Sequence, residues 1–435
     1  MARILGAHRI AAAVVALALV LSGCAGGGGR KGPIELTFWS WVPGIDKSVA
    51  LWNRTHPGVQ VHLDQITAGA DGGYAKMFSA VKAGSGPDVA QVEYWAIPAF
   101  VLEGGLVDLS KHGVRQYQNR FVPWQWNQGV FNGGVYAVPQ ASGPMALYYR
   151  ADLFAKYGLK PPATWADYAK AAAVIKQKDP TASIGTFPPA NSQWFISLAW
   201  QAGAHWFGAA DKWSVDIDDP ATQKVASYWD GLRRKGLVDT MPDVQTGWYK
   251  AVHDGKILAW VGPQWGDALL KGNAPNTAGK WRVAPMPQWD PKHEASSNWG
   301  GSSSAVLRGT THPDEAMQFA VWLNTDRGSI NDLIAGGYGW PAAAGALKGS
   351  ALDHPDPFFG GQRYNDVFAD ADKHIDTGWR WIPTTMSLID TLNTGFTNAI
   401  TSPHGTFLGA VRTAQTTTVR DMRRKGLQVV APPER

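Results

Sequence analysis

Cysteine is almost absent from this chain: a single one, Cys24, stands among 435 residues. A lone thiol excludes an internal disulfide framework and a zinc site built from cysteine ligands. Positive charge is also sparse, because the formal net charge is only +5 and the one short basic cluster is Arg423-Arg424-Lys425 near the end. So weak a charge gives little electrostatic support for nucleic-acid binding, and we predict no nucleic-acid partner.

Long apolar runs are missing too, except for residues 10–21 near the start. This run is too short to span a bilayer, which takes about 20 helical residues. Basic residues precede it and small residues follow it, which is the order of a secretory signal. The run ends in Leu21-Ser22-Gly23-Cys24, which resembles the bacterial lipobox, whose cysteine is acylated and becomes the new N-terminus.

We therefore expect a lipoprotein signal peptide over 1–23, an acylated Cys24 and a flexible glycine-rich tether over 24–33. The body would lie outside the cytoplasm, anchored by lipid to the cell membrane. An ordinary signal peptide that happens to meet a cysteine is the alternative.

Sequence motifs of several enzyme classes are missing as well. The chain has no Gly-x-Ser-x-Gly elbow, no His-Glu-x-x-His and no Walker loop, and its 11 histidines are scattered. We therefore predict no catalytic residues, no metal and no cofactor. A pair of glycosidase carboxylates needs no local motif, so a secreted carbohydrate-active enzyme stays open as an alternative. A surface-interaction lipoprotein is the other alternative.

Tryptophan is abundant, with 22 residues. Each offers a large flat apolar face and one N–H donor. We expect many of them in the core, but several stand beside glycines or prolines at predicted strand ends, where loops meet ligands. Aromatic planes suit the C–H faces of a sugar, while carboxylates, amides and arginine suit its hydroxyls. The tryptophans therefore favour a sugar ligand.

Strands and helices alternate after the tether. Residues 34–40, 59–63 and 88–92 have the pattern of strands, while 45–52 and 74–81 have helical spacing of apolar residues. This order predicts a mostly parallel sheet with right-handed crossovers. Ligands of such open sheets bind beyond the carboxyl ends of the strands.

Several segments in sequence order resemble the extracellular solute-binding proteins of bacterial ABC importers, in the branch that takes up sugars and oligosaccharides. These segments are Leu36–Trp41, Pro87–Val92, Val135–Gln140, Leu147–Phe154 and Gly300–Val306. The resemblance implies a receptor without enzymatic activity that closes on a sugar or oligosaccharide and delivers it to ABC permease subunits. It also implies a protein that works as a monomer.

The resemblance further implies an α/β fold of two lobes, periplasmic-binding-protein-like of type II. Each lobe would hold a mostly parallel sheet flanked by helices, with a hinge between the lobes. We place the chain crossings near 140–148 and 300–306. The predicted bounds are 34–140 with 303–346 for lobe one, and 141–302 with 347–435 for lobe two.

Strand ends, aromatic residues and the resemblance together select the candidate site. The predicted ligand-binding residues are Trp39, Trp41, Asp71, Glu93, Tyr94, Gln140, Trp194, Gln264, Trp265, Trp299, Gly300, Tyr338, Trp340, Trp379 and Arg380.

The lipid anchor gives a first testable prediction. Replacing Cys24→Ala removes the thiol that would carry the acyl chains, so the variant should leave the membrane fraction of cells while the parent chain stays in it. Fractionation followed by immunoblotting measures this. Equal membrane retention of both proteins would contradict the anchor.

Overall fold

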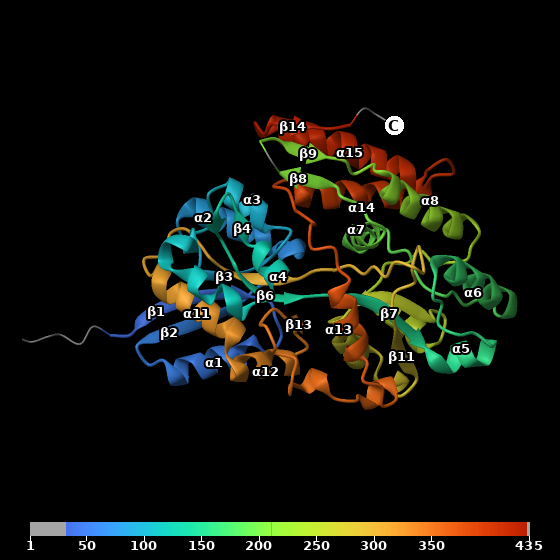
Figure 1. Ribbon diagram of the computed structural model, residues 1–435, viewed down its shortest axis with the longest axis horizontal. Coiled ribbons are helices and arrows are strands. Elements are labelled where there is room, and N and C mark those ends of the chain that lie inside the picture. Colours follow the sequence, from blue (N-terminus) through green and yellow to red (C-terminus); the bar gives the residue numbers. More distant parts are fainter. Residues whose placement is uncertain (1–31, 210, 433–435) are drawn as a thin grey trace, which may run out of the picture.

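The computed structural model describes residues 32–209 and 211–432 (Figure 1). The predicted signal peptide, Cys24 and all but the last two residues of the tether lie outside the described residues. Figure 1 shows two lobes side by side. We call the part built on the sheet that contains β1 (Ile34–Ser40) lobe one, and the part built on the sheet that contains β7 (Met145–Arg150) lobe two. None of the described helices is long and apolar enough to cross a membrane.

Lobe one is built on a six-stranded sheet in the order β13-β6-β12-β3-β1-β2. β1 is parallel to β2 and β3, whereas β12 is antiparallel to β3 and β6. The predicted parallel strands are thus present, and β12, which returns from lobe two, lies beside β3 in the opposite direction. The strands are β1 (Ile34–Ser40), β2 (Val59–Gln65), β3 (Val89–Glu93), β6 (Val138–Ser142), β12 (Ser302–Val306) and β13 (Trp340–Pro341).

Helices cover both faces of this sheet. The predicted apolar face of α1 is buried, and its Trp52 contacts Phe319 of α11 edge to face at 5.3 Å. Phe38 of β1 contacts the same Phe319 at 5.4 Å, which joins helix and sheet in one core. The helices are α1 (Ile45–Thr55), α2 (Gly73–Ala83), α3 (Ile97–Leu102), α4 (Pro123–Asn127), α11 (Pro313–Thr325) and α12 (Arg327–Ala335), with a small hairpin of β4 (Val130–Phe131) and β5 (Gly134–Val135).

Lobe two contains a three-stranded sheet in the order β10-β7-β11. Both neighbours of β7 are antiparallel to it, so this sheet differs from the mostly parallel one that we predicted. The reason is the path of the chain: β7 leads away from the hinge, and β10 and β11 both lead back. The strands are β7 (Met145–Arg150), β10 (Ala259–Pro263) and β11 (Trp281–Ala284), and a second small sheet holds β8 (Phe207–Ala209), β9 (Trp213–Val215) and β14 (Val429–Val430).

Two helices of lobe two begin after residues that cap their N-termini. The side chain of Thr164 accepts a hydrogen bond from the backbone N–H of Asp167 at the start of α6, and Asp219 caps α8 by accepting from the backbone N–H of Thr222. The helices are α5 (Ala151–Tyr157), α6 (Trp165–Lys178), α7 (Ser192–Gln201), α8 (Pro220–Arg234), α9 (Thr246–His253), α10 (Gly266–Asn273), α13 (Asn365–Lys373), α14 (Thr385–Thr401) and α15 (Phe407–Arg424).

Two crossing segments run antiparallel to each other between the lobes. The N–H of Trp299 donates to Gly143 O at 2.9 Å, and the N–H of Met145 donates to Ser297 O at 3.1 Å. Asn298 Oδ1 accepts from Gly143 N at 2.7 Å. The chain therefore changes sheets close to the predicted crossings, at 142–145 and 297–302, while the full lobe bounds stay a prediction.

The crowding at Gly143 gives a second prediction. A Cβ atom there would lie 2.1 Å from Trp299 O and 2.7 Å from Trp265 Nε1. Gly143→Ala should therefore lower the free energy of unfolding by about 1–3 kcal/mol, because the crossing segments must shift. Urea unfolding measures it.

Gly231→Ala is the matched control, since Gly231 lies inside α8 with no atom within 4 Å of its would-be Cβ. That variant should be more stable by about 0.5–1 kcal/mol. If Gly143→Ala behaved like this control, the tight packing of the crossing would be wrong.

Candidate functional site

Four buried polar side chains form a hydrogen-bonded row across neighbouring strands of lobe one. Ser40 Oγ donates to Gln91 Oε1 at 2.6 Å, Gln91 Nε2 donates to Ser302 Oγ at 3.3 Å, and Ser302 Oγ donates to Gln140 Oε1 at 2.9 Å. Gln140 Nε2 is buried and has no hydrogen-bond partner among the described residues. A buried donor without a partner is costly, so this end of the row is suited to a ligand oxygen.

Glu93 lies at the end of β3, close to this row. The hydroxyl of Tyr74 donates to Glu93 Oε2 at 3.1 Å and accepts from the backbone N–H of Glu93 at 2.7 Å. Burial raises the pKa of Glu93 to about 7, and the nearby Asp71 adds to the increase, while the neighbouring Trp95 and the hydrogen bond from Tyr74 oppose it. The carboxyl is thus held in a half-buried place where a ligand hydroxyl could bind it.

Aromatic rings surround Glu93. The ring of Tyr74 lies edge to face with Trp41 at 6.0 Å and with Trp95 at 5.3 Å. Trp41 is half-buried, and Asp71 is exposed at the end of a short 3-10 helix, Gly69–Asp71. The structure therefore brings the predicted residues Trp41, Asp71 and Glu93 to one place. We call Trp41, Asp71, Tyr74, Glu93 and Trp95 the acidic cluster.

Lobe two presents the segment 379–381 toward lobe one. Trp379 is stacked on Trp200 at 4.8 Å, and the half-buried Trp381 lies edge to face with Trp379 at 5.6 Å. Gln128, which follows α4 of lobe one, donates from Nε2 to Trp379 O at 3.3 Å, so the lobes touch here. Trp379 Nε1 is buried without a hydrogen-bond partner among the described residues, and Arg380 is exposed.

Asp372 of α13 adds a carboxyl that we did not predict. Burial raises its pKa to about 6, while the indole N–H groups of Trp340 and Trp124 lower it. Its Oδ1 is buried and has no hydrogen-bond partner in the described part of the chain. A lobe-two acid thus faces two lobe-one tryptophans, of which Trp340 was predicted.

Trp265 and Trp299 lie at the hinge. Trp265 Nε1 donates to Trp299 O at 3.0 Å, and the two rings lie edge to face at 5.2 Å. Gly300 has a φ of 79°, and a Cβ there would lie 3.3 Å from Trp265 Nε1. These three predicted residues do meet, but they form part of the joint between the lobes. A direct role in binding stays a prediction for the half-buried Trp265.

Two further predicted residues, Trp194 and Trp39, have partners within their own lobes. Trp194 is 1% exposed in the core of lobe two, where its Nε1 donates to Val261 O at 2.8 Å. Trp39 donates from Nε1 to Asp64 at 2.9 Å, and Lys76 covers its ring at 4.2 Å. Both tryptophans already have partners for ring and N–H, and their role in binding stays a prediction.

The other predicted residues are buried near the interface of the lobes. Tyr94 donates from its hydroxyl to Gln125 Oε1 at 3.3 Å, and the hydroxyl of Tyr338 is buried without a partner among the described residues. Gln264 donates from Nε2 to Asn365 Oδ1 at 3.1 Å and leaves Oε1 unpaired within that same part of the chain. Their role in binding stays a prediction.

Residues that sequence reasoning missed include Tyr74, Trp95, Trp124, Gln128 and Asp372. Trp95 stands two residues after Glu93, so its place at the same strand end could have been used to predict it. Asp372 stands in an acidic helical segment, where nothing distinguishes it from the exposed Asp370. Only the fold shows that it faces the opposite lobe.

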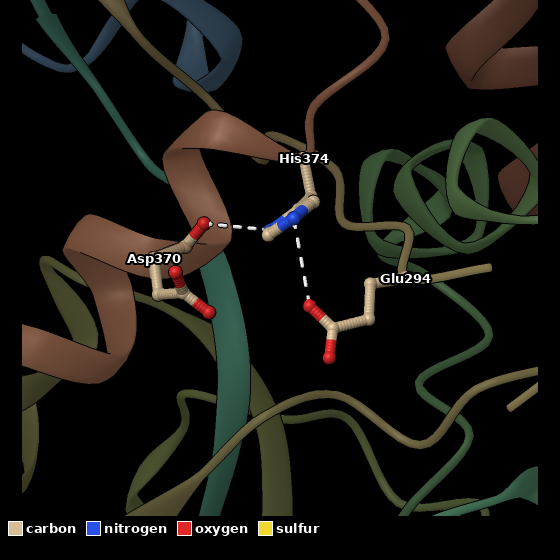
Figure 2. A group of neighbouring side chains, drawn as sticks. All are labelled: Glu294, Asp370 and His374. Atoms are coloured by element: carbon tan, nitrogen blue, oxygen red, sulfur yellow. Dashed lines mark hydrogen bonds and ion pairs between the residues drawn. The ribbon is translucent and has the colours of Figure 1, made fainter. Parts of the chain in front are cut away.

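One group of side chains in the described residues has ligand atoms close enough for a metal ion (Figure 2). It consists of Glu294, Asp370 and His374, and Figure 2 shows His374 between the other two. His374 Nε2 lies 3.5 Å from Glu294 Oε2, and Nδ1 lies 2.9 Å from the backbone oxygen of Asp370. Both carboxylates are exposed, and the histidine already has protein partners on both ring nitrogens, so we assign no metal here.

Comparison with known proteins finds a matching family model and several relatives of this chain. The family model of bacterial extracellular solute-binding proteins matches residues 39–330. An arabinooligosaccharide-binding protein of Halalkalibacterium halodurans is 24% identical over 306 residues, which are 67% of this chain and 67% of that protein. A protein of Streptomyces antibioticus named an uncharacterized lipoprotein is 26% identical over 377 residues, 79% of this chain and 78% of that one.

Among solved structures, the galacto-N-biose/lacto-N-biose I-binding protein of an ABC transporter from Bifidobacterium longum is similar in fold. It was solved in complex with lacto-N-biose, and its TM-score is 0.84 at 26% identity, with 92% of this chain and 100% of that chain covered.

The raised pKa of Glu93 gives a third prediction. The folded carboxyl holds its proton up to about pH 7, whereas the unfolded one loses it near 4.5. The folded state therefore binds more protons between these values, and stability falls as the pH rises through them. Glu93→Gln cannot ionise, so it should be as stable as the parent near pH 4 and more stable, by about 1 kcal/mol or more, at pH 8.

Urea unfolding between pH 4 and pH 8 measures this difference. Asp390→Asn, at an exposed carboxylate of α14, is the control and should follow the parent. Parallel stability curves for the parent and Glu93→Gln would contradict the raised pKa.

Proposed function

Since this chain belongs to the bacterial extracellular solute-binding proteins, we propose that it captures a sugar or oligosaccharide between its lobes and hands it to an ABC import permease. It is a binding protein and not an enzyme, as its family is defined by solute binding. The protein would work outside the cytoplasm, held at the membrane through Cys24.

The observation that carries the proposal is the pairing of aromatic faces with unused polar groups between the lobes. Lobe one offers Trp41 and Glu93 of the acidic cluster, with Gln140 Nε2 beside it. Lobe two offers Trp381 and, on its neighbour Trp379, an unpaired indole N–H. A sugar has apolar C–H faces and a rim of hydroxyls, so it can use both kinds of group at once.

The ligands of the relatives support the same class of ligand for this chain. The Bifidobacterium protein was solved in complex with lacto-N-biose, and the Halalkalibacterium protein is named for arabino-oligosaccharides. The relative named a lipoprotein supports the anchor. Delivery to a permease is supported by the ABC transporter to which the Bifidobacterium protein belongs.

Binding is tested with lacto-N-biose and arabino-oligosaccharides as probes. A sugar that binds only the folded protein raises its melting temperature, and calorimetry gives the affinity. Chromatography of the sugar after incubation should return it intact. A cleaved sugar would contradict the receptor and support a carbohydrate-active enzyme, and a lack of binding to a broad sugar panel would contradict the sugar ligand.

The fourth prediction concerns stacking. Trp381→Ala should weaken sugar binding by about 1–3 kcal/mol, as expected for a large aromatic at the centre of an interface. Trp322→Ala is the control, because Trp322 is half-buried on α11, where it contacts Trp52 at 5.2 Å in the core of lobe one. Equal affinities of the two variants would contradict a role for Trp381.

A further inference from the structure

A cavity lies between the lobes, close to the acidic cluster. It has a volume of about 290 Å³. Its walls come from α2 and α3 of lobe one and from the start of α14 and the end of α15 of lobe two. We call it the rim cavity, and it is lined by Phe78, Lys82, Ala99, Glu103, Pro383, Thr384, Met386, Ser387, Asp421, Arg424 and Lys425.

The lining of the rim cavity combines apolar surface with polar groups at its edge. Phe78, Ala99 and Met386 supply apolar atoms, and Lys82 supplies an exposed ammonium group. Lys425 Nζ lies 3.2 Å from Glu103 Oε1, which joins the two lobes across the opening. The short basic cluster at the end of α15 thus lies against lobe one. Because both lobes contribute walls, the cavity is complete only when the lobes are in contact.

One buried polar group in this wall makes no hydrogen bond with the described residues. Thr384 is 4% exposed, and its Oγ1 has no hydrogen-bond partner among the described residues. A threonine at the N-cap of a helix normally accepts from a backbone N–H of the first turn. Thr384 precedes α14 but makes no such side-chain bond. Its hydroxyl therefore has unused hydrogen-bonding capacity in the wall of the cavity.

The rim cavity adjoins the acidic cluster on both sides of the cleft. In lobe one, Phe78 is stacked on Phe100 at 4.1 Å, and Phe100 contacts Tyr74, which holds Glu93, at 5.7 Å. In lobe two, Pro383 and Thr384 follow Trp381 by two and three residues. A chain of sugar residues that leaves the central site in this direction would meet the cavity.

We propose that the rim cavity is an outer subsite, which binds one further sugar residue through Thr384 Oγ1 and Lys82, and that the ligand is therefore an oligosaccharide. This rests on the proposed function. An oligosaccharide long enough to fill both places gains contacts with both lobes, whereas a shorter sugar leaves Thr384 unpaired. Affinity then increases with chain length up to the residue that fills the rim cavity.

The test compares Thr384→Val with Thr418→Val in the full chain. Thr418 is a matched control, because it is 2% exposed, has an Oγ1 without a partner in the described residues, and does not line the rim cavity. Calorimetry with arabino-oligosaccharides of two to five residues, and with lacto-N-biose and longer chains that contain it, gives affinities. Thermal melting checks that each variant is folded.

We expect Thr384→Val to lose roughly three- to tenfold in affinity for the longer sugars and nothing for the shortest, the range of one lost hydrogen bond. Thr418→Val should match the parent at every length. Lys82→Met, at an exposed position that cannot disturb the fold, should show the same dependence on length with a smaller loss.

Two results would overturn the subsite, and they are distinguishable. If sugars bind but affinity is independent of length, or Thr384→Val changes all lengths equally, the subsite is wrong while the proposed function stands. If no sugar of any length binds, the proposed function fails and the subsite fails with it.

Discussion

Gly143 can carry no side chain, because Trp299 O and Trp265 Nε1 occupy the space where its Cβ would lie. This close approach allows two chain segments to pair between the lobes with Trp299 N on Gly143 O and Met145 N on Ser297 O. Two paired segments restrict how one lobe can move relative to the other and suit a hinge, in which a few residues absorb the motion. The rest of the account depends on this joint, since both lobes contribute groups to the site.

The candidate site contains buried polar groups whose hydrogen-bonding capacity the described residues do not fill. Gln140 Nε2, Trp379 Nε1 and Asp372 Oδ1 are buried, and none has a hydrogen-bond partner within the described residues. Most buried polar groups in proteins are paired, so several unpaired ones at one interface indicate a place for a ligand. The rings of Trp41 and Trp381 add the apolar surface that a sugar face needs.

Much of the fold was predictable, because it depends on local patterns. The strands near 34–40 and 88–92, the buried face of α1 and the caps at Thr164 and Asp219 follow from spacing and cap chemistry. The antiparallel sheet of lobe two was not predictable, since strand direction depends on how the chain returns to the hinge.

The site was predictable only in part. Glu93 and Trp41 end strands, so their place follows from the sheet, but Trp194 ends in the core and Asp372 faces the opposite lobe through long-range packing. Periodicity does not separate a core tryptophan from one that faces a ligand, and it carries no information about contacts between lobes.

Small-angle X-ray scattering with and without a bound sugar tests the central claim, capture by lobe closure, most directly. The lobes touch in this structure through Gln128 and Trp379. The account predicts that the sugar-bound protein fits this arrangement and that the sugar-free protein has a larger radius of gyration, because only the closed form contacts the ligand from both sides. A tightly bound sugar that leaves the scattering profile unchanged would contradict closure.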